Sequence, residues 1–259
     1  MITTALLLTA GLGTRLGPLG QLLAKPALPV AGEPMVCRII RWLVDAGVTD
    51  LVLNLHHRPA SLTAAVGDGS HLGARVRYSW EHPQVLGSAG GPRQALDILG
   101  SDRFLIVNGD TLTAFDLRAF IGAHERAGAP VTMALVPNHE YEKYGGVHLD
   151  AAGRVTHFSR RGPASAGSTH FVGVQAVHRD VFAGIPSGAV ASTVGGVYDA
   201  RISAEPGAIA GQIVDATFFD VGTSGDYLRT SLAFSALSPQ GSDVAGEATV
   251  GADARIRGS

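Results

Sequence analysis

Apolar runs alternate with amphipathic segments through the first half of the chain. The run Ala5–Leu8 ends in a glycine-containing turn, and two more apolar runs follow at Asp50–Leu55 and Phe104–Val107. Runs that are apolar throughout are typical of parallel strands buried on both faces of a sheet. After the first run, apolar residues recur at helical spacing. This predicted helix begins near Pro34, ends at Gly47 and carries Val36, Ile39, Ile40, Leu43 and Val44 on one face.

The same alternation continues to residue 136. The pattern predicts a strand at Arg75–Trp80, a short helix at Gln94–Leu99 and a strand at Val131–Val136. Between the last two, Asp116 is a typical helix N-cap, and Gly128 is a typical residue to end that helix. Alternating strands and helices predict an α/β fold, a doubly wound and mainly parallel sheet with helices on both faces.

From Tyr144 onward the pattern changes to short strands joined by turns, which predicts a β-rich second half. The predicted strands are Gly145–Leu149, Val155–Phe158, Phe171–Val177 and Ala216–Phe219. Two helices accompany them, a short one near Asp180–Ala183 and a closing one at Asp226–Leu237.

The final segment shows a third pattern. Val244, Val250 and Ile256 recur with a period of six residues. An aliphatic residue at this period predicts the start of a left-handed parallel β-helix. A chance pattern in a Gly- and Ala-rich tail is the alternative. We therefore expect a main domain at 1–237 and, at 238–259, a linker with an incomplete β-helix.

Composition narrows the function further. The chain of 259 residues is 46% hydrophobic with 34 glycines, which suits a loop-rich globular α/β protein. A formal net charge of −2 gives no electrostatic basis for binding nucleic acid or an anionic membrane. The single Cys37 excludes an intrachain disulfide framework, and no apolar run approaches membrane-spanning length. We expect a soluble, cytoplasmic protein.

The turn after the first strand is the leading candidate for chemistry. Its sequence is Leu8-Thr9-Ala10-Gly11-Leu12-Gly13-Thr14-Arg15-Leu16, with Lys25-Pro26 further on. Exposed backbone N–H groups and two cations suit a polyphosphate, and we expect Pro26 to hold Lys25 in an extended backbone. A dinucleotide fingerprint would need glycine in place of Leu16, and no Gly-Lys-Ser/Thr follows for a P-loop. A strand–helix turn with two solvated cations is the plainer alternative.

Together with later motifs, this turn resembles the signature of the sugar-1-phosphate nucleotidyltransferases, and most closely that of mannose-1-phosphate guanylyltransferases. The later motifs are Leu86-Gly87-Ser88-Ala89-Gly90, Val107-Asn108-Gly109-Asp110, Tyr144-Gly145-Gly146-Val147 and Phe219-Asp220-Val221-Gly222-Thr223. The resemblance covers about residues 1–237 in the family's order. It implies a Rossmann-like nucleotidyltransferase fold and the reaction of a nucleoside triphosphate with a sugar 1-phosphate, giving a nucleotide sugar and pyrophosphate.

The resemblance also implies a set of catalytic and nucleotide-binding residues. Arg15 would bind the β- and γ-phosphates, and Lys25 would bridge the α-phosphate and the sugar phosphate. Asp110 and Asp220 would hold Mg²⁺ as hard oxygen ligands. The implied nucleotide contacts are Leu8, Ala10, Gly11, Leu12, Gly13, Thr14, Arg15, Glu81, Gly87, Ser88, Gly90, Asn108 and Gly109.

The sugar side departs from the family pattern. The implied sugar-phosphate contacts are Tyr144, Gly145, Gly146, Arg160, Arg161 and Gly173. The family's Glu-Lys-Pro motif would fall near Phe158–Pro163, where the acid is missing, so Arg160 or Arg161 would replace its lysine. A solvated turn is the alternative for that segment. The identity of the sugar therefore stays open.

We expect a Mg²⁺-dependent enzyme that uses GTP with mannose 1-phosphate or a related sugar. The alternatives are a UTP-dependent uridylyltransferase, such as one acting on N-acetylmuramate 1-phosphate, and a non-catalytic regulatory subunit that binds nucleotide sugars. A Rossmann dehydrogenase is disfavoured by Leu16. The expected partners are the two substrates, with no nucleic acid and no membrane, and a homo-oligomer is compatible with the sequence.

Overall fold

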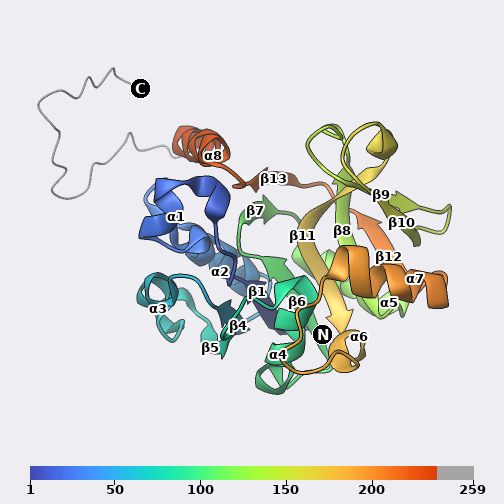
Figure 1. The fold of residues 1–259 in the computed structure, drawn as a ribbon, viewed down its shortest axis with the longest axis horizontal. Helices are drawn as coiled ribbons and strands as arrows, with labels where there is room; N and C mark the ends of the chain where they lie inside the picture. Colours follow the sequence, from blue (N-terminus) through green and yellow to red (C-terminus); the bar gives the residue numbers. More distant parts are fainter. Residues whose placement is uncertain (238–259) are drawn as a thin grey trace, which may run out of the picture.

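The computed structural model describes residues 1–237, and these contain a central mixed sheet (Figure 1). One half of this sheet consists of the parallel strands β1 (Thr4–Leu8), β4 (Asp50–Leu55), β5 (Arg75–Trp80) and β6 (Arg103–Asn108), in the order β5-β4-β1-β6. Ala5 pairs with Leu51 on one side and Leu105 on the other. The carboxyl ends of β1 and β6 therefore meet at one edge, where open α/β sheets bind ligands.

The other half of the sheet is built around an antiparallel strand, β11 (Thr169–His178), which pairs with β6. On its far side lie β8 (Val131–Pro137) and β12 (Ile209–Ile213), while the hairpin of β9 (Gly146–Leu149) and β10 (Val155–Ser159) joins β11 at its first residue. The pairing of β11 with β8 shifts between Phe171 and Gln175, an irregularity of the kind that bends a strand. The predicted β-rich second half is confirmed.

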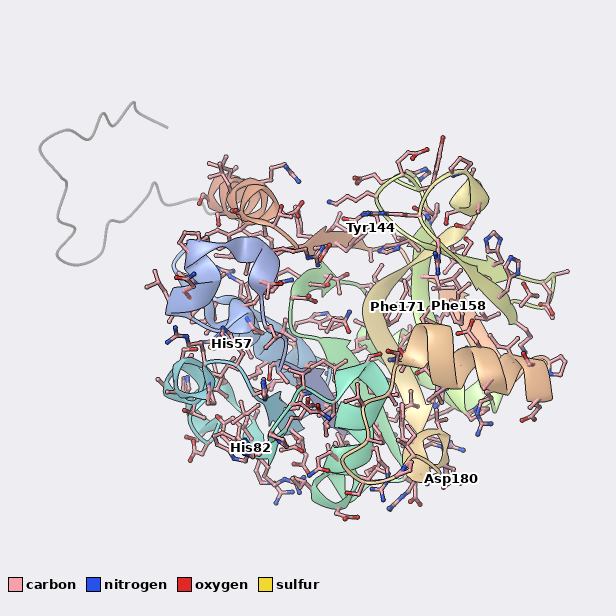
Figure 2. All side chains as sticks on the ribbon, viewed as in Figure 1. His57, His82, Tyr144, Phe158, Phe171 and Asp180 are labelled. Carbon is pink, nitrogen blue, oxygen red and sulfur yellow. The ribbon has the colours of Figure 1, made fainter. Side chains whose placement is uncertain are left out.

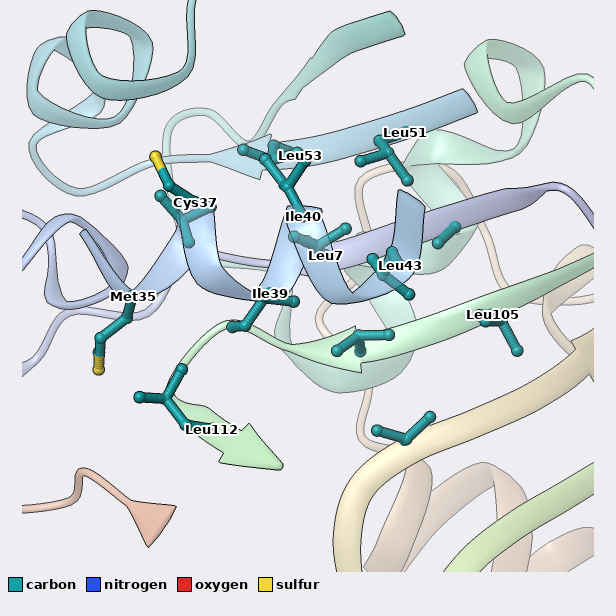
Figure 3. Packing of buried hydrophobic residues seen from close by; sticks show 14 of the residues in the cluster. Leu7, Met35, Cys37, Ile39, Ile40, Leu43, Leu51, Leu53, Leu105 and Leu112 are labelled. Atoms are coloured by element: carbon teal, nitrogen blue, oxygen red, sulfur yellow. The ribbon is translucent and has the colours of Figure 1, made fainter. Parts of the chain in front are cut away.

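Helices cover both faces of the sheet because its strands are apolar on both sides. Leu7 packs with α2 (Met35–Asp45) and α5 (Leu117–Ala127) on one face. Its neighbour Leu6 faces the opposite side, in the core with α4 (Gly87–Leu99), α6 (Asp180–Ala183) and α7 (Tyr198–Ala204). Figure 3 shows the first contact: Ile39, Ile40 and Leu43 of α2 lie over the strands that carry Leu7, Leu53 and Leu105.

Smaller elements complete the described chain. The helices α1 (Pro18–Leu22) and α3 (Pro59–Val66) lie beside the parallel half, and α8 (Ser224–Leu237) follows the last strand (Figure 1). Two separate two-stranded sheets are β2 (Pro29–Val30) with β3 (Glu33–Pro34), and β7 (Thr111–Ala114) with β13 (Thr217–Asp220).

Several sequence-based boundaries need correction. α4 begins at Gly87 rather than Gln94, so the Leu-Gly-Ser-Ala-Gly motif forms its first turn. α3, α7, β7 and β12 were not predicted. The expected β-helix start at 238–259 lies outside the described residues. Within 1–237, no helix is long and apolar enough to cross a membrane.

The predicted N-cap of α5 gives a direct test of the fold. Asp116 Oδ1 accepts a hydrogen bond from the Ala119 N–H at 2.9 Å. Because the cap satisfies an otherwise unpaired donor, Asp116→Ala should lower the free energy of unfolding by about 1 kcal/mol in urea titrations. Asp116→Asn keeps a capping oxygen and should lose less than about 0.5 kcal/mol. Equal losses in the two variants would contradict the capping role.

Candidate active site

The turn after β1 carries the two cations that the sequence singles out, in different settings. Arg15 is exposed on a short 3-10 helix, Thr14–Leu16. Lys25 is only 8% exposed and begins a second 3-10 helix, Lys25–Ala27. The expectation of an extended backbone at Lys25 is therefore wrong, because proline is tolerated in the first turn of a helix, where its missing N–H has no partner to lose.

Lys25 and Asp110 form an ion pair at the end of the parallel sheet. Lys25 Nζ lies 2.7 Å from Asp110 Oδ2. The pair depends on a close approach at Gly109, whose N–H donates to the Leu8 carbonyl at 3.0 Å. A Cβ at this glycine would lie 2.8 Å from that same oxygen and 3.1 Å from Pro26 Cγ, so only glycine fits without a backbone shift. The ends of β1 and β6 and the Lys25-Pro26 turn thus meet at one point.

Asp220 reaches this point through the pairing of β7 with β13. Asp220 is the register partner of Thr111, and the next residue, Val221, donates its N–H to the Asp110 carbonyl at 3.0 Å. Burial raises the pKa of Asp220, and the nearby Asp110 carboxylate raises this pKa further, against the opposing effect of Lys25. The two predicted metal ligands therefore come together.

The donor set fits Mg²⁺. Asp110 and Asp220 supply hard oxygen donors, and their negative charges repel each other. A divalent cation between them would offset this repulsion. The described residues contain no group of three or more His, Cys, Asp or Glu side chains at metal-binding spacing. Mg²⁺ usually takes one or two carboxylates and completes its shell with phosphate oxygens and water. A pair of aspartates is therefore sufficient on the protein side.

Two cavities meet at Asp110 and Asn108. The first, of about 240 Å³, is called here the loop cavity. Nine of the predicted residues line it, and its full lining is Leu8, Thr9, Ala10, Gly11, Lys25, Pro26, Asn54, Glu81, Val85, Gly87, Ser88, Asn108 and Asp110.

A buried polar bridge shapes the loop cavity. Asn54 Oδ1 accepts from the Thr9 N–H at 2.6 Å, and Asn54 Nδ2 donates to Glu81 Oε1 at 2.6 Å. The other carboxylate oxygen of Glu81 accepts from the Leu86 N–H at 2.6 Å. Both bridging side chains are under 4% exposed. Buried polar groups that are paired in this way fix the position of the segments they join. Asn54, at the end of a predicted strand, was missed in the sequence.

Ser88 connects the loop cavity to a distant segment. Its Oγ accepts from the Thr193 N–H at 2.9 Å and lies 3.0 Å from Thr193 Oγ1. The Ala89 N–H donates to the Ala191 carbonyl at 2.9 Å. The predicted nucleobase segment is thus held by residues that follow β11, a contact that no local sequence signal announces.

The second cavity, of about 320 Å³, is called here the aromatic cavity. Its lining is mainly apolar and includes the predicted Tyr144, Gly145 and Gly146, and the full set is Asn108, Asp110, Thr111, Met133, Tyr144, Gly145, Gly146, Val147, Phe158, Ser159, His170, Phe171, Val194, Phe218 and Asp220. The Tyr144 ring stacks on His170 with centroids 4.2 Å apart. Figure 2 shows Tyr144, Phe158 and Phe171 gathered on the β-rich half.

Other predicted residues lie outside these linings. Arg15 approaches the Asp220 turn, because a Cβ at Gly222 would be 3.5 Å from Arg15 Nη1 and 3.3 Å from Asp220 Oδ2. Gly173 lies against Asn108. Arg160 and Arg161 are exposed and belong to neither lining. The remaining residues outside the linings are Leu12, Gly13, Thr14, Gly90 and Gly109.

The described residues thus form an α/β fold with two cavities that share Asn108 and Asp110, close to the carboxyl end of β6. Comparison with known families agrees. The model of the Nucleotidyl transferase family matches residues 4–183, and the chain belongs to this family.

Relatives with different substrates in their names match this chain. The chain is 33% identical over 229 residues to a mannose-1-phosphate guanylyltransferase of Mycobacterium tuberculosis, covering 88% of this chain and 63% of the relative. It is 31% identical to a D-glycero-alpha-D-manno-heptose 1-phosphate guanylyltransferase of Aneurinibacillus thermoaerophilus, over 69% of this chain and 76% of the relative. Over a shorter stretch, 44% of this chain and 50% of the relative, it is 43% identical to an N-acetylmuramate alpha-1-phosphate uridylyltransferase of Neisseria meningitidis. The chain thus spans less than two thirds of the first and third of these relatives.

Solved structures show the same fold. HddC from Yersinia pseudotuberculosis, solved as a complex with GMP-PN, superposes with a TM-score of 0.75 at 22% identity, over 90% of this chain and all of that one. A UDP-glucose pyrophosphorylase from Acinetobacter baumannii gives a TM-score of 0.77 at 20% identity, over 93% and 95% of the two chains.

The raised pKa of Asp220, caused first by burial and then by the Asp110 carboxylate, predicts a stability difference. The pKa of Asp220 is raised in the folded state, so ionising this group as the pH rises costs folding free energy. Asp220→Asn should therefore unfold at a higher urea concentration than the wild type at pH 7 in EDTA. The gain should shrink as the pH falls through the raised folded-state pKa and should be lost below about 4, where the unfolded-state carboxyl is also protonated. Asp97→Asn, on an exposed face of α4, is the matched control. A gain that persists unchanged at low pH would contradict this account.

Proposed function

We propose that this chain is a sugar-1-phosphate nucleotidyltransferase, which converts a nucleoside triphosphate and a sugar 1-phosphate into a nucleotide sugar and pyrophosphate. The meeting of the loop cavity and the aromatic cavity at Asn108 and Asp110 carries this proposal. A nucleotide in the first and a sugar phosphate in the second would have their phosphates side by side. Placing two reactants in this way supplies a large part of a transfer barrier.

The reaction needs charge neutralisation more than proton transfer. A non-bridging oxygen of the sugar phosphate attacks the α-phosphorus, and the bond from that phosphorus to the α–β bridging oxygen breaks as pyrophosphate leaves. The nucleophile is already an anion, so no general base is required. Catalysis therefore requires cations that bring the two anions together and stabilise the charge on the leaving group.

The chain's own cations have distinct parts in this scheme. Lys25, nearly buried and paired with Asp110, is held where the two cavities join and binds the α-phosphate and the sugar phosphate. Arg15 is exposed near Gly222 and is free to bind the β- and γ-phosphates and the departing pyrophosphate. The backbone of Gly11 and its neighbours lines the loop cavity, where N–H groups suit phosphate oxygens.

Asp110 and Asp220 are the residues that would hold Mg²⁺. Bound there, the ion would supply positive charge to the phosphate oxygens during transfer.

For the substrates, we propose GTP with mannose 1-phosphate or a related sugar as the first pair. The similarity to the Mycobacterium tuberculosis guanylyltransferase over 88% of this chain supports this choice. UTP with N-acetylmuramate 1-phosphate is the second pair, supported by the higher identity, 43%, to the Neisseria meningitidis uridylyltransferase over a shorter stretch.

Pyrophosphate release tests the proposal. The purified protein with Mg²⁺ should release pyrophosphate with GTP and mannose 1-phosphate faster than with UTP and N-acetylmuramate 1-phosphate. The reverse order would give the role to the second pair. Silence across a full panel of nucleoside triphosphates and sugar phosphates would overturn the enzymatic proposal, and tight nucleotide-sugar binding without turnover would then identify a regulatory subunit.

Asp110→Asn tests the charge assignment. This variant keeps the shape of the side chain but removes the charge that Lys25 and the metal ion need. We expect turnover to fall by roughly two orders of magnitude or more, with the cooperative unfolding transition retained. Steady-state pyrophosphate release at saturating Mg²⁺ and circular dichroism are the measurements. Near-normal turnover would refute the assignment.

A further inference from the structure

The lining of the aromatic cavity carries negative charge. Its lining contains two carboxylates, Asp110 and Asp220, and among the described residues no lysine or arginine belongs to it. A sugar 1-phosphate would bring further negative charge into this space. Lys25 comes from the neighbouring loop cavity and is already paired with Asp110. Arg160 and Arg161, which the sequence offers for this task, are exposed and outside the lining.

Lys143 is a cation placed at the edge of this cavity. It lies between β8 and β9, directly before Tyr144, whose ring belongs to the lining. Its Nζ is 4.8 Å from the centre of that ring and 3.2 Å from Asp226 Oδ1. The Lys143 side chain is 39% exposed, so its long stem has room to move.

The partner of Lys143 sits beside the proposed metal ligand. A Cβ at Gly222 would be 3.3 Å from Asp220 Oδ2 and also 3.3 Å from Asp226 Oδ2. Both carboxylates therefore flank the same backbone position, and Lys143 is bound to Asp226.

The Asp226 carboxylate has hydrogen-bond donors other than Lys143. Its Oδ2 accepts from the Thr223 N–H at 2.9 Å and from Thr223 Oγ1 at 2.7 Å. Arg229 Nη2 donates to Oδ1, the same oxygen that Lys143 contacts. Lys143 can thus leave without stranding a buried, unpaired carboxylate, the main cost of breaking such a pair. An ammonium group whose carboxylate partner has other donors, beside a cavity whose described lining has no lysine or arginine, is suited to bind an incoming anion.

We propose that Lys143 binds the phosphate of the sugar 1-phosphate. In the absence of this substrate, Lys143 is paired with Asp226. The proposal rests on the function proposed above. It gives Lys143 the task that Arg160 or Arg161 was expected to perform.

Separate Michaelis constants for the two substrates test the proposal. Lys143→Ala should raise the KM for the sugar 1-phosphate at least tenfold at saturating nucleoside triphosphate, while the KM for the nucleotide changes less than twofold. Lys143→Arg retains a cation and should recover part of the loss. Arg75→Ala removes an equivalent charge from β5, where its side chain is 70% exposed, and should leave both constants unchanged.

Each other outcome decides against the proposal. An unchanged KM for the sugar phosphate in Lys143→Ala, or an equal rise for both substrates, would overturn it. The same selective rise in Arg160→Ala or Arg161→Ala, with Lys143→Ala unaffected, would return the role to that arginine. Lys143→Gln replaces Lys143→Ala if the latter lacks a cooperative unfolding transition. A wild type that releases no pyrophosphate on the full panel would instead refute the proposed function, and the role of Lys143 with it.

Discussion

The site depends on holding two carboxylates, Asp110 and Asp220, in one small space against their mutual repulsion. The main sheet places Asp110, and the short pairing of β7 with β13 brings Asp220 to it from near the end of the described chain. Lys25 offsets part of the repulsion at 2.7 Å. Burial and, after it, the Asp110 carboxylate raise the pKa of Asp220, and a divalent cation bound between the two carboxylates would offset both effects.

Much of the fold could be predicted because its strongest signals are local. The strands at Asp50–Leu55 and Arg75–Trp80 and the helix at Asp180–Ala183 have the predicted bounds, and the Asp116 cap forms as expected. Strand periodicity, N-cap chemistry and terminal glycines act within a few residues, so they are visible without the rest of the chain. The loop after β1 and the two aspartates were found through motifs of the same short range.

The elements that were missed owe their existence to distant partners. β7, with the sequence Thr-Leu-Thr-Ala, is too short for its alternation to predict a strand, and it pairs with a segment far along the chain. β12 contains a glycine and is completed by its parallel neighbour β8. Asn54 gains its role only when Thr9 and Glu81 surround it. Such contacts are properties of the assembled sheet, which no window of sequence contains.

Under the proposed function, the two cavities would select their ligands by different physical interactions, which explains why the sugar is harder to assign than the nucleotide. The loop cavity offers fixed polar groups, including the bridged Asn54 and Glu81, that can recognise hydrogen-bonding edges. The aromatic cavity instead presents surfaces such as Phe158, Phe171 and Phe218. Apolar contacts separate sugars that differ by one group only about 10- to 200-fold, whereas matched hydrogen bonds can exceed this by orders of magnitude. Under the proposed function, discrimination among sugars would come chiefly from the shape of the cavity and from the few polar groups around Ser159 and His170. Small changes in this wall would then change the sugar that binds without altering the residues proposed to bind the phosphates.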